Sequence, residues 1–257
     1  MRAGKAGRMN CDRLGRYYEM LERLTFGRRL EKRRFAFLTE AAKTERALLC
    51  GDGDGRYLAE LLRVNARVRV DFVDLSGGMI AIAKRRVAKM GKGFRERVRF
   101  FTCDVMEFEP EVSGYDLIGT HFFLDCFSEA EIGTAVARVA SWGALDVRWL
   151  VSEFCEAERG LGRVWTQMVI SGLYAAFRLT TGLRVTRLPD YAGALAEHGF
   201  YLRKRETDLG GLLCSGVWEA SIGREGCAPA CILNESRKEW TVMTAATTGP
   251  RSAASGR

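Results

Sequence analysis

Short apolar runs alternate along this chain with longer stretches whose apolar residues recur every three or four positions. The short runs predict strands over Arg46–Cys50, Val68–Val73, Val98–Thr102, Tyr115–Thr120 and Trp149–Phe154. The longer stretches between them predict helices over 56–63, 79–90 and 129–141. Strands that alternate with helices indicate a parallel sheet covered by helices on both faces.

The pattern is different at the two ends of the chain. Residues 14–43 and 164–179 have helical spacing, a short helix is expected over 190–198, and two further strands over 201–207 and 213–220. We therefore expect a disordered basic segment at 1–11, one domain over 12–220, and a disordered tail over 221–257. Within the domain, 12–45 should form a helical cap and 158–188 a helical insertion over a pocket.

Composition fits one substantial core, because the chain has 257 residues of which 47% are hydrophobic. No apolar run is long enough to cross a bilayer, and no secretory signal is evident, so we expect a cytoplasmic protein. The eight cysteines include no CxxC pair, and the chain has only two histidines. We therefore expect core thiols and no metal.

A net charge of +8 raises the question of an acidic partner. A basic run near the N-terminus contains Arg28, Arg29, Lys32, Arg33 and Arg34. We interpret this run as the solvated face of a helix; an acidic membrane surface, a phosphate-bearing substrate or nucleic acid is the alternative. No nucleic-acid partner is expected, because no zinc finger or RNA-recognition signature accompanies the charge.

A glycine-rich segment follows the first predicted strand, with Gly51, Gly53 and Gly55 at alternating positions around Asp52 and Asp54. Glycines let a chain turn sharply and let a ligand approach the backbone, and the next helix points its free amides at that ligand. The spacing differs from the G-x-G-x-x-G of dinucleotide-binding proteins, and no P-loop lysine follows.

Acidic residues stand at the ends of the next two strands. Asp74 lies about twenty residues after the glycines, where a carboxylate can accept hydrogen bonds from ribose hydroxyls. Asp71 is a rival inside the same strand. Asp104 follows the third strand, where it can accept a hydrogen bond from an exocyclic amine. The apolar residues Leu75, Met79 and Val105 complete this part of the predicted site.

These segments, in this order, resemble the class I S-adenosylmethionine-dependent methyltransferases over residues 12–220. The resemblance implies an α/β, Rossmann-like, seven-stranded and mostly parallel sheet with helices on both faces and an N-terminal helical lid. It implies that S-adenosylmethionine is the cofactor and S-adenosylhomocysteine the product. The glycine loop would then hold the methionine moiety, Asp74 the ribose and Asp104 the adenine, while Thr120 lies in the fourth-strand motif that faces cofactor and substrate.

The stretch Asp12–Tyr18 resembles the opening helix of the ubiquinone/menaquinone-biosynthesis-like branch, in which a tyrosine covers the cofactor; Tyr17 matches that position. One residue departs from the family pattern. The family usually carries an acidic residue two positions before the first glycine, where this chain has Leu49. A hydrogen-bond network behind the loop is therefore in question, although Asp52 or Asp54 offers a replacement carboxylate.

The acceptor side of the site is predicted beyond the fourth strand. His121 and Asp125 are candidate general bases, although His121 is also suited to shaping the pocket and Asp125 to starting a helix. Tyr18, Phe122, Phe123 and Trp165 are candidate pocket residues, although aromatic residues at helical spacing often belong to the core.

The sequence thus predicts methyl transfer to a small, apolar or aromatic acceptor. The alternatives are a non-catalytic S-adenosylmethionine-binding scaffold, and a methyltransferase that acts on RNA or protein. An Asn-Pro-Pro-Tyr-like tetrad is missing after the fourth strand, which argues against amine methylation of nucleobases or glutamine.

Overall fold

The computed structural model describes residues 28–157, 159–181, 185 and 187–221; for residues 176–181 it describes the backbone alone. These residues belong to the first of two compact units, Met1–Ile222; the second unit, Gly223–Arg257, lies outside the described residues. The predicted disordered segments at 1–11 and 221–257 therefore fall outside them, apart from residue 221. In the described part of the chain, no helix has the length and apolar character that a membrane span requires.

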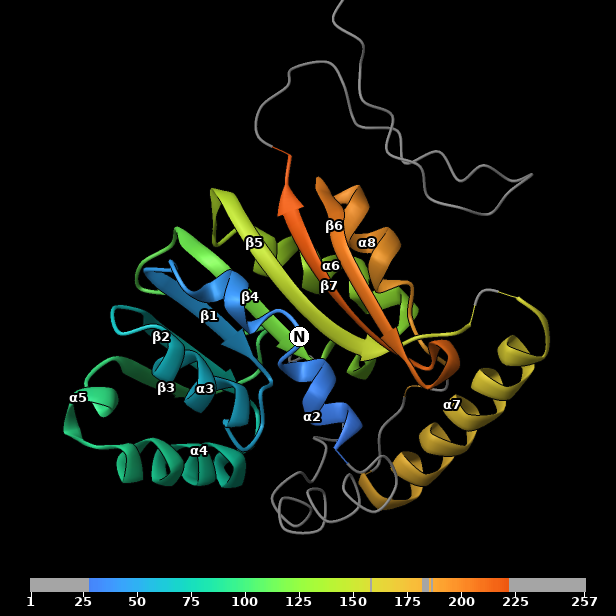
Figure 1. Cartoon of the computed structure of the whole chain (residues 1–257), viewed down its shortest axis with the longest axis horizontal. Helices are drawn as coiled ribbons and strands as arrows, with labels where there is room; N and C mark the ends of the chain where they lie inside the picture. The colour runs from blue at the N-terminus through green and yellow to red at the C-terminus, as the bar shows by residue number, and fades with distance from the viewer. Residues whose placement is uncertain (1–27, 158, 182–184, 186, 222–257) are drawn as a thin grey trace, which may run out of the picture. The chain divides into compact units, whose positions relative to one another are not determined.

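Seven strands form one sheet, as Figure 1 shows. They are β1 (Arg46–Cys50), β2 (Arg69–Asp74), β3 (Val98–Thr102), β4 (Tyr115–His121), β5 (Gly143–Phe154), β6 (Phe200–Asp208) and β7 (Leu213–Ala220). Their order is β3-β2-β1-β4-β5-β7-β6. Strands β1 to β5 are parallel, and β7 runs antiparallel to both β5 and β6. The predicted Rossmann-like, mostly parallel sheet is confirmed.

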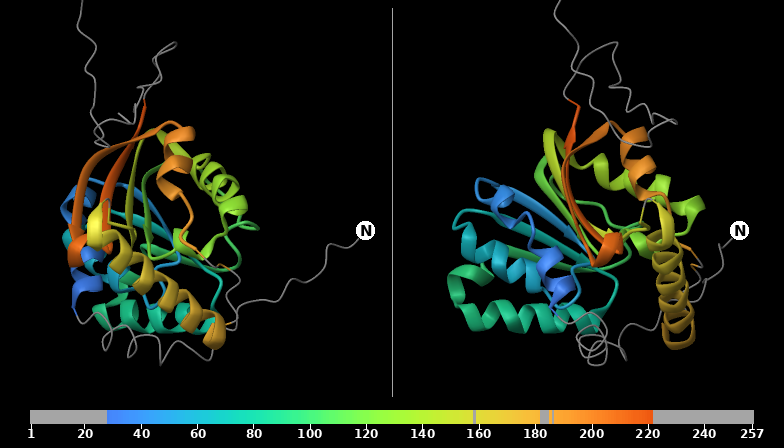
Figure 2. Two further views of the ribbon diagram at one scale, coloured as in Figure 1. Left: turned by 90° about the vertical axis from the view of Figure 1, so that its right-hand side faces the viewer. Right: turned by 45° about the vertical axis from the view of Figure 1, so that its right-hand side comes forward.

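Helices lie on both faces of this sheet (Figure 2). The described helices are α2 (Arg29–Arg34), α3 (Arg56–Val64), α4 (Gly77–Met90), α5 (Lys92–Arg95), α6 (Glu129–Ala140), α7 (Gly160–Thr181) and α8 (Tyr191–Glu197). Short 3-10 turns, η1 (Leu38–Ala41), η2 (Leu124–Cys126) and η3 (Leu209–Gly211), complete the set. Helices α3 and α4 pack on one face, and α6 and α8 on the other.

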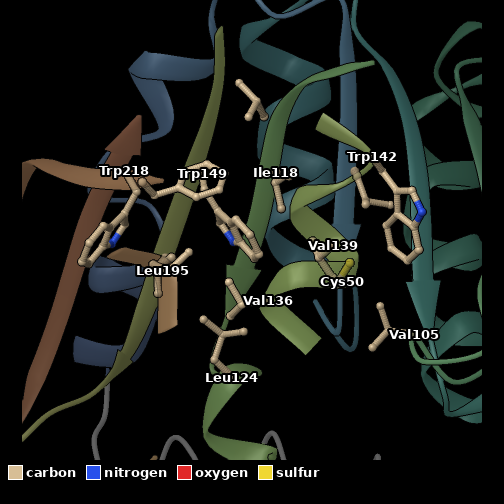
Figure 3. Close-up of a cluster of buried hydrophobic side chains, with 14 of the residues drawn as sticks. Cys50, Val105, Ile118, Leu124, Val136, Val139, Trp142, Trp149, Leu195 and Trp218 are labelled. Carbon is tan, nitrogen blue, oxygen red and sulfur yellow. The ribbon is translucent and has the colours of Figure 1, made fainter. Parts of the chain in front are cut away.

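The alternation of side chains along each strand divides the core into two layers. On β1, Leu48 and Cys50 join the cluster under α6 and α8, which Figure 3 shows around Trp149 and Leu195. Ala47 and Leu49 of the same strand join the cluster under α3 and α4. A third cluster lies at the carboxyl ends of the strands and is built by Leu30, Phe122, Phe154, Ile170, Tyr174, Val185, Leu212 and Leu213.

Two predicted elements differ from the structure in extent. Strand β5 begins at Gly143 rather than Trp149, because its first half carries exposed residues such as Leu145 and Asp146 that give no core signal. Of the helical cap expected over 12–45, the described residues include α2 and the η1 turn, while residues 12–27 lie outside them. Within the predicted insertion over 158–188, α7 begins at Gly160.

The interpretation of the basic run as a solvated helix face is wrong for two of its residues. Arg33 and Arg34 in α2 are only 4% and 5% exposed. Arg33 donates to Glu206 over 2.9 Å, and its carbonyl accepts hydrogen bonds from the hydroxyls of Ser152 and Ser215. Helix α2 is therefore fixed against the carboxyl end of β5 and the amino end of β7, and part of its charge is buried.

Candidate active site

The site is organised around the point where the strand order reverses. Strand β1 pairs with β2 on one side and with β4 on the other, so the connections after β1 and β4 leave in opposite directions. In open α/β sheets, ligands bind in the crevice outside the carboxyl ends of the strands at such a point. Most of the predicted cofactor residues lie at or after the ends of β1, β2 and β3, and most of the predicted acceptor residues lie at or after the end of β4.

The glycine loop has the backbone conformation that its sequence predicts. Gly51, Gly53 and Gly55 have φ angles of 66°, 64° and 74°, in the left-handed region that L side chains rarely adopt. A Cβ on Gly55 would lie 2.8 Å from the Cβ of Ala83, so this glycine also lets α3 begin close to α4. A Cβ on Gly51 would overlap the ring of Phe123. Two of the three glycines are thus required for close packing as well as for the turn.

Asp74 at the end of β2 is joined to this loop. Its Oδ2 accepts a hydrogen bond from the Gly53 backbone N–H over 3.1 Å, and its Oδ1 accepts one from the Ser76 N–H over 2.8 Å. Burial raises the pKa of Asp74, while these two hydrogen bonds act in the opposite direction. The Sδ of Met79 lies 3.9 Å from the position of a Cβ on Gly53, so Met79 also borders the loop.

Asp104 follows β3 beside the end of β2. The Cys103 N–H donates to the Asp74 carbonyl over 3.2 Å, and the Asp104 Oδ1 accepts from the Met106 N–H over 2.9 Å. Leu75 is 38% exposed at this edge. The side chain of Val105 is 5% exposed and packs in the cluster with α6, so its role at the predicted site stays a prediction.

The two carboxylates within the loop have different surroundings. Asp52 is buried and accepts a hydrogen bond at Oδ2 from the Leu58 N–H over 3.1 Å, and burial raises its pKa to about 7. Asp54 forms ion pairs with Arg56 over 3.0 Å and with Arg86 over 2.7 Å. Asp52 therefore accepts a hydrogen bond from the first turn of α3, while the ion pairs of Asp54 link the loop to α3 and α4.

His121 is enclosed by other side chains rather than exposed at the opening of the crevice, which corrects the prediction. It is 3% exposed, its Nδ1 is 3.1 Å from the Ser152 Oγ, and its ring centroid is 4.2 Å from that of Tyr57. Burial, followed by the positive charge of Arg34, lowers the pKa of His121 well below its ordinary value. A neutral, enclosed imidazole is poorly placed to take a proton from an acceptor.

Leu49 and Thr120 have surroundings that the sequence did not indicate. Leu49, in place of the usual acid, packs against Gly119 of β4; a Cβ on Gly119 would lie 2.6 Å from the Leu49 Cδ2. The position is therefore part of the apolar layer under α3. Thr120, expected to face the cofactor, instead points into the opposite layer, where its Oγ1 accepts from the Trp149 Nε1–H over 2.9 Å.

The described residues predicted for the acceptor side lie in and around the turn after β4 and on α7. Phe122 lies in the apolar cluster with Tyr174, whose hydroxyl donates to the Asp125 carbonyl over 3.1 Å. Burial raises the pKa of the Asp125 carboxyl to about 6. Trp165 does not share this environment, because it is 46% exposed on α7. The predicted Tyr17 and Tyr18 lie outside the described residues.

The structure adds buried polar residues that the sequence analysis missed. Glu153 on β5 is 0% exposed, and its Oε1 accepts hydrogen bonds from the Phe123 and Leu124 N–H groups. Arg34 has its guanidinium 5.7 Å from the centroid of the Phe122 ring. The one available signal for Glu153 was an acidic residue inside an otherwise apolar strand-like run.

The residues around the glycine loop fit S-adenosylmethionine. Asp52 Oδ1, the Tyr57 hydroxyl and His121 Nε2 are buried atoms that have no hydrogen-bond partner in the described part of the chain. Buried polar groups are nearly always paired, so these atoms suit a polar ligand group or water. Both donors and acceptors are available there, as the ammonium and carboxylate of an amino-acid moiety need. Asp74, the residue predicted to hold the ribose, is hydrogen-bonded to the same loop.

Comparison with known proteins is consistent with this geometry. Residues 47–143 match a family described as a methyltransferase domain. The N-terminal Xaa-Pro-Lys N-methyltransferase 1 of Rattus norvegicus is 34% identical over 95 residues, which are 37% of this chain and 41% of that protein. The polyamine aminopropyltransferase 2 of Bacillus anthracis is 35% identical over 86 residues, or 32% of this chain and 24% of that protein. The chain thus matches less than half of the length of either relative.

Solved structures share the fold over most of the chain. The mitomycin 7-O-methyltransferase MmcR has a TM-score of 0.61 at 16% identity, covering 81% of this chain and 60% of that one. The O-methyltransferase NcsB1 of neocarzinostatin biosynthesis, solved with S-adenosylmethionine and 2-hydroxy-5-methyl naphthoic acid, has a TM-score of 0.58 at 15% identity, covering 82% and 60%. Together with the domain match, they support a class I S-adenosylmethionine-dependent methyltransferase. The narrower branch prediction stays a prediction, since residues 12–18 lie outside the described residues.

Proposed function

We propose that this chain transfers the methyl group of S-adenosylmethionine to a small, apolar or aromatic acceptor. The observation that carries the proposal is the junction between the left-handed glycine loop and the Asp74 carboxylate, 3.1 Å from the Gly53 nitrogen, at the point where the strand order reverses. Glycines without side chains and an acidic strand end are what a nucleoside-bearing ligand needs at this place.

The proposed cofactor contacts follow from this junction. Asp74 accepts hydrogen bonds from the ribose hydroxyls, and Asp104 faces the adenine. Gly51, Asp52 and Gly53 receive the amino-acid end at the start of α3. When bound, S-adenosylmethionine supplies a methyl group on a sulfonium, which an acceptor takes by direct displacement. The chain's own contribution is then to orient the acceptor and to exclude water.

Water exclusion is assigned to the apolar cluster at the carboxyl ends of β4 and β5. Phe122 and Phe154 lie with ring centroids 5.6 Å apart, and Ile170 and Tyr174 of α7 pack with them. For a hydroxyl acceptor, we assign Asp125 as the base that takes the acceptor proton. A carboxyl whose pKa is raised to about 6 by burial is ionised near neutrality yet more basic than an ordinary aspartate.

A second candidate acceptor is an amino group. Both relatives carry amine chemistry in their names, an N-methyltransferase for protein N-termini and a polyamine aminopropyltransferase. An amine must lose a proton to become nucleophilic, and Asp125 would serve there too. The aromatic surroundings of Asp125 favour the small-molecule acceptor as the first choice.

The direct test is transfer of a labelled methyl group. The protein is incubated with S-adenosylmethionine labelled in the methyl group and a panel of phenols, quinols, amines and a peptide that begins Xaa-Pro-Lys. We expect label in a phenol or quinol, and label in the peptide would support the second candidate. Tight S-adenosylhomocysteine binding with no transfer to any acceptor would favour the scaffold alternative, and no binding would overturn both proposals.

A further inference from the structure

A fully buried carboxyl lies next to the proposed acceptor side. Glu153 precedes the last residue of β5 and has no exposed surface. Its Oε1 accepts one hydrogen bond from the Phe123 N–H over 2.9 Å and a second from the Leu124 N–H over 2.7 Å. One side-chain oxygen thus satisfies two successive backbone donors of the turn that follows β4.

The turn held in this way has an unfavourable backbone conformation. Phe122 has a φ of 57°, in the left-handed region that favours glycine. Its own N–H donates to the Ser152 carbonyl over 2.7 Å. Three successive amides, at 122, 123 and 124, are therefore bound to the neighbouring residues 152 and 153 of β5. Conformations of this kind persist only where the surrounding structure over-determines them.

The neighbouring rings of Phe122 and Phe123 in this turn lie in different parts of the site. The Phe122 ring packs on Phe154 in the apolar cluster under α7. The Phe123 ring lies directly against Gly51, where it fills the space that a Cβ would need, and it contacts Phe127 edge-on with centroids 5.3 Å apart. The turn thus contacts the glycine loop through Phe123 and the apolar cluster under α7 through Phe122.

We propose that Glu153 is a positioning residue of this enzyme: it fixes the Phe122–Leu124 turn and thereby holds the Phe123 ring on the cofactor loop at Gly51. This inference rests on the proposed function, because it assigns Glu153 a role in cofactor binding. Glu153 acts through the turn and is not assigned contact with the reacting atoms.

The raised pKa of the Glu153 carboxyl indicates which substitution is conservative. Burial, and next the charge of Asp125, raise the pKa of Glu153 well above its ordinary value, which favours the uncharged form of this carboxyl. A glutamine has nearly the same shape and the same carbonyl acceptor as a protonated glutamate. Glu153→Gln should therefore keep the turn, whereas Glu153→Leu keeps much of the volume and removes the acceptor.

The experiment compares S-adenosylhomocysteine affinity in the wild type, Glu153→Gln and Glu153→Leu, by calorimetry at a temperature where each is folded. We expect Glu153→Leu to bind about tenfold or more weakly, since two buried donors lose their acceptor, and Glu153→Gln to stay within about threefold of the wild type. Tyr115→Phe is the matched control. It removes a buried hydrogen bond to Asp71 at the far end of β4, so it should lower the melting temperature without weakening binding.

The outcomes separate the two proposals. A wild type that does not bind S-adenosylhomocysteine overturns the proposed function itself. A wild type that binds, together with Glu153→Leu of equal affinity, overturns only the positioning role. If Glu153→Leu does not fold, Phe123→Ala removes the ring that the turn positions: we expect a loss of affinity of at least about fivefold, and unchanged affinity would contradict the proposal.

Discussion

The Gly53 backbone N–H donates to the Asp74 carboxylate over 3.1 Å, which joins the loop after β1 to the end of β2. The second oxygen of the same carboxylate accepts from Ser76, the residue that also caps α4 through its hydroxyl. One side chain therefore ties together the glycine loop, the end of a strand and the start of a helix. A ligand that binds the loop must lie next to this carboxylate, which is why we give it the central role in cofactor recognition.

The first prediction concerns Asp74. Asp74→Ala should weaken S-adenosylhomocysteine binding by about 1–3 kcal/mol, the range for a lost charged acceptor. Titration calorimetry measures this change. Asp116→Ala is the matched control, because Asp116 accepts from the Glu45 and Arg46 N–H groups at the opposite end of β1. Affinity unchanged in Asp74→Ala would remove this residue from the site.

The second prediction separates packing from backbone strain in the glycine loop. Gly51→Ala combines an unfavourable φ with a Cβ that overlaps the Phe123 ring, so it should cost about 2–4 kcal/mol of folding stability and abolish cofactor binding. Gly199→Ala has a φ of 81° but open space around its Cβ, so it should cost only about 1 kcal/mol. Urea unfolding of both variants measures the difference in folding stability. Equal losses of stability would show that the Phe123 ring does not restrict the space at Gly51.

The third prediction uses the buried Asp52. Burial raises its pKa to about 7 in the folded state, against about 3.9 in an unfolded chain. The folded protein keeps a proton that the unfolded chain has lost, so stability falls as the pH rises from about 4 to about 7. Asp52→Asn keeps the acceptor for Leu58 and cannot ionise, so it should be on the order of 2–4 kcal/mol more stable than the wild type at pH about 8, and little changed at pH about 4.

Unfolding by urea at the two pH values tests this prediction. Asp54→Asn serves as the comparison, because Asp54 is paired with Arg56 and Arg86 and should lose stability at both pH values. An Asp52→Asn protein that is less stable than the wild type at the higher pH would mean that the charge of Arg34 keeps Asp52 ionised.

The fourth prediction concerns the base on the acceptor side. If Asp125 takes the acceptor proton, the rate of methyl transfer should fall as the pH drops through about 6, where its carboxyl becomes protonated. The pH profile of kcat/KM on a phenol or quinol acceptor measures this. Asp125→Asn should lower turnover by about 100-fold or more and remove the acidic limb of the profile. A profile in Asp125→Asn with the same acidic limb would assign the base to another residue.

Sequence patterns were sufficient for the sheet and for the conformation of the glycine loop. Alternating glycines after a strand permit a left-handed loop that other residues disfavour, and Asp74 follows from its place at the end of the next strand. These features depend on local backbone chemistry and on chain order. The two further strands expected at 201–207 and 213–220 are also present as β6 and β7, although β6 is rich in charged residues and only β7 is a buried run.

The acceptor side depends on contacts between distant residues, which a single sequence does not reveal. His121 is buried because Tyr57 of α3 and Ser152 of β5 meet its ring. Arg33 is buried because Glu206, far along the chain, pairs with it. In the sequence, Glu153 is an acidic residue that interrupts an apolar strand. Its partners, the Phe123 and Leu124 N–H groups, come from the turn after β4. Each case is a polar side chain whose burial is partly compensated by a partner from another element.

Amide hydrogen exchange with and without S-adenosylhomocysteine tests the central claim most directly, because it locates the ligand on the backbone. The account predicts slower exchange in the ligand complex at residues 51–56, 74–79 and 103–106, with no change in the second half of α4. Binding accompanied by protection only outside these three segments, or no binding at all, would contradict the assignment of the glycine loop and Asp74 as the cofactor site.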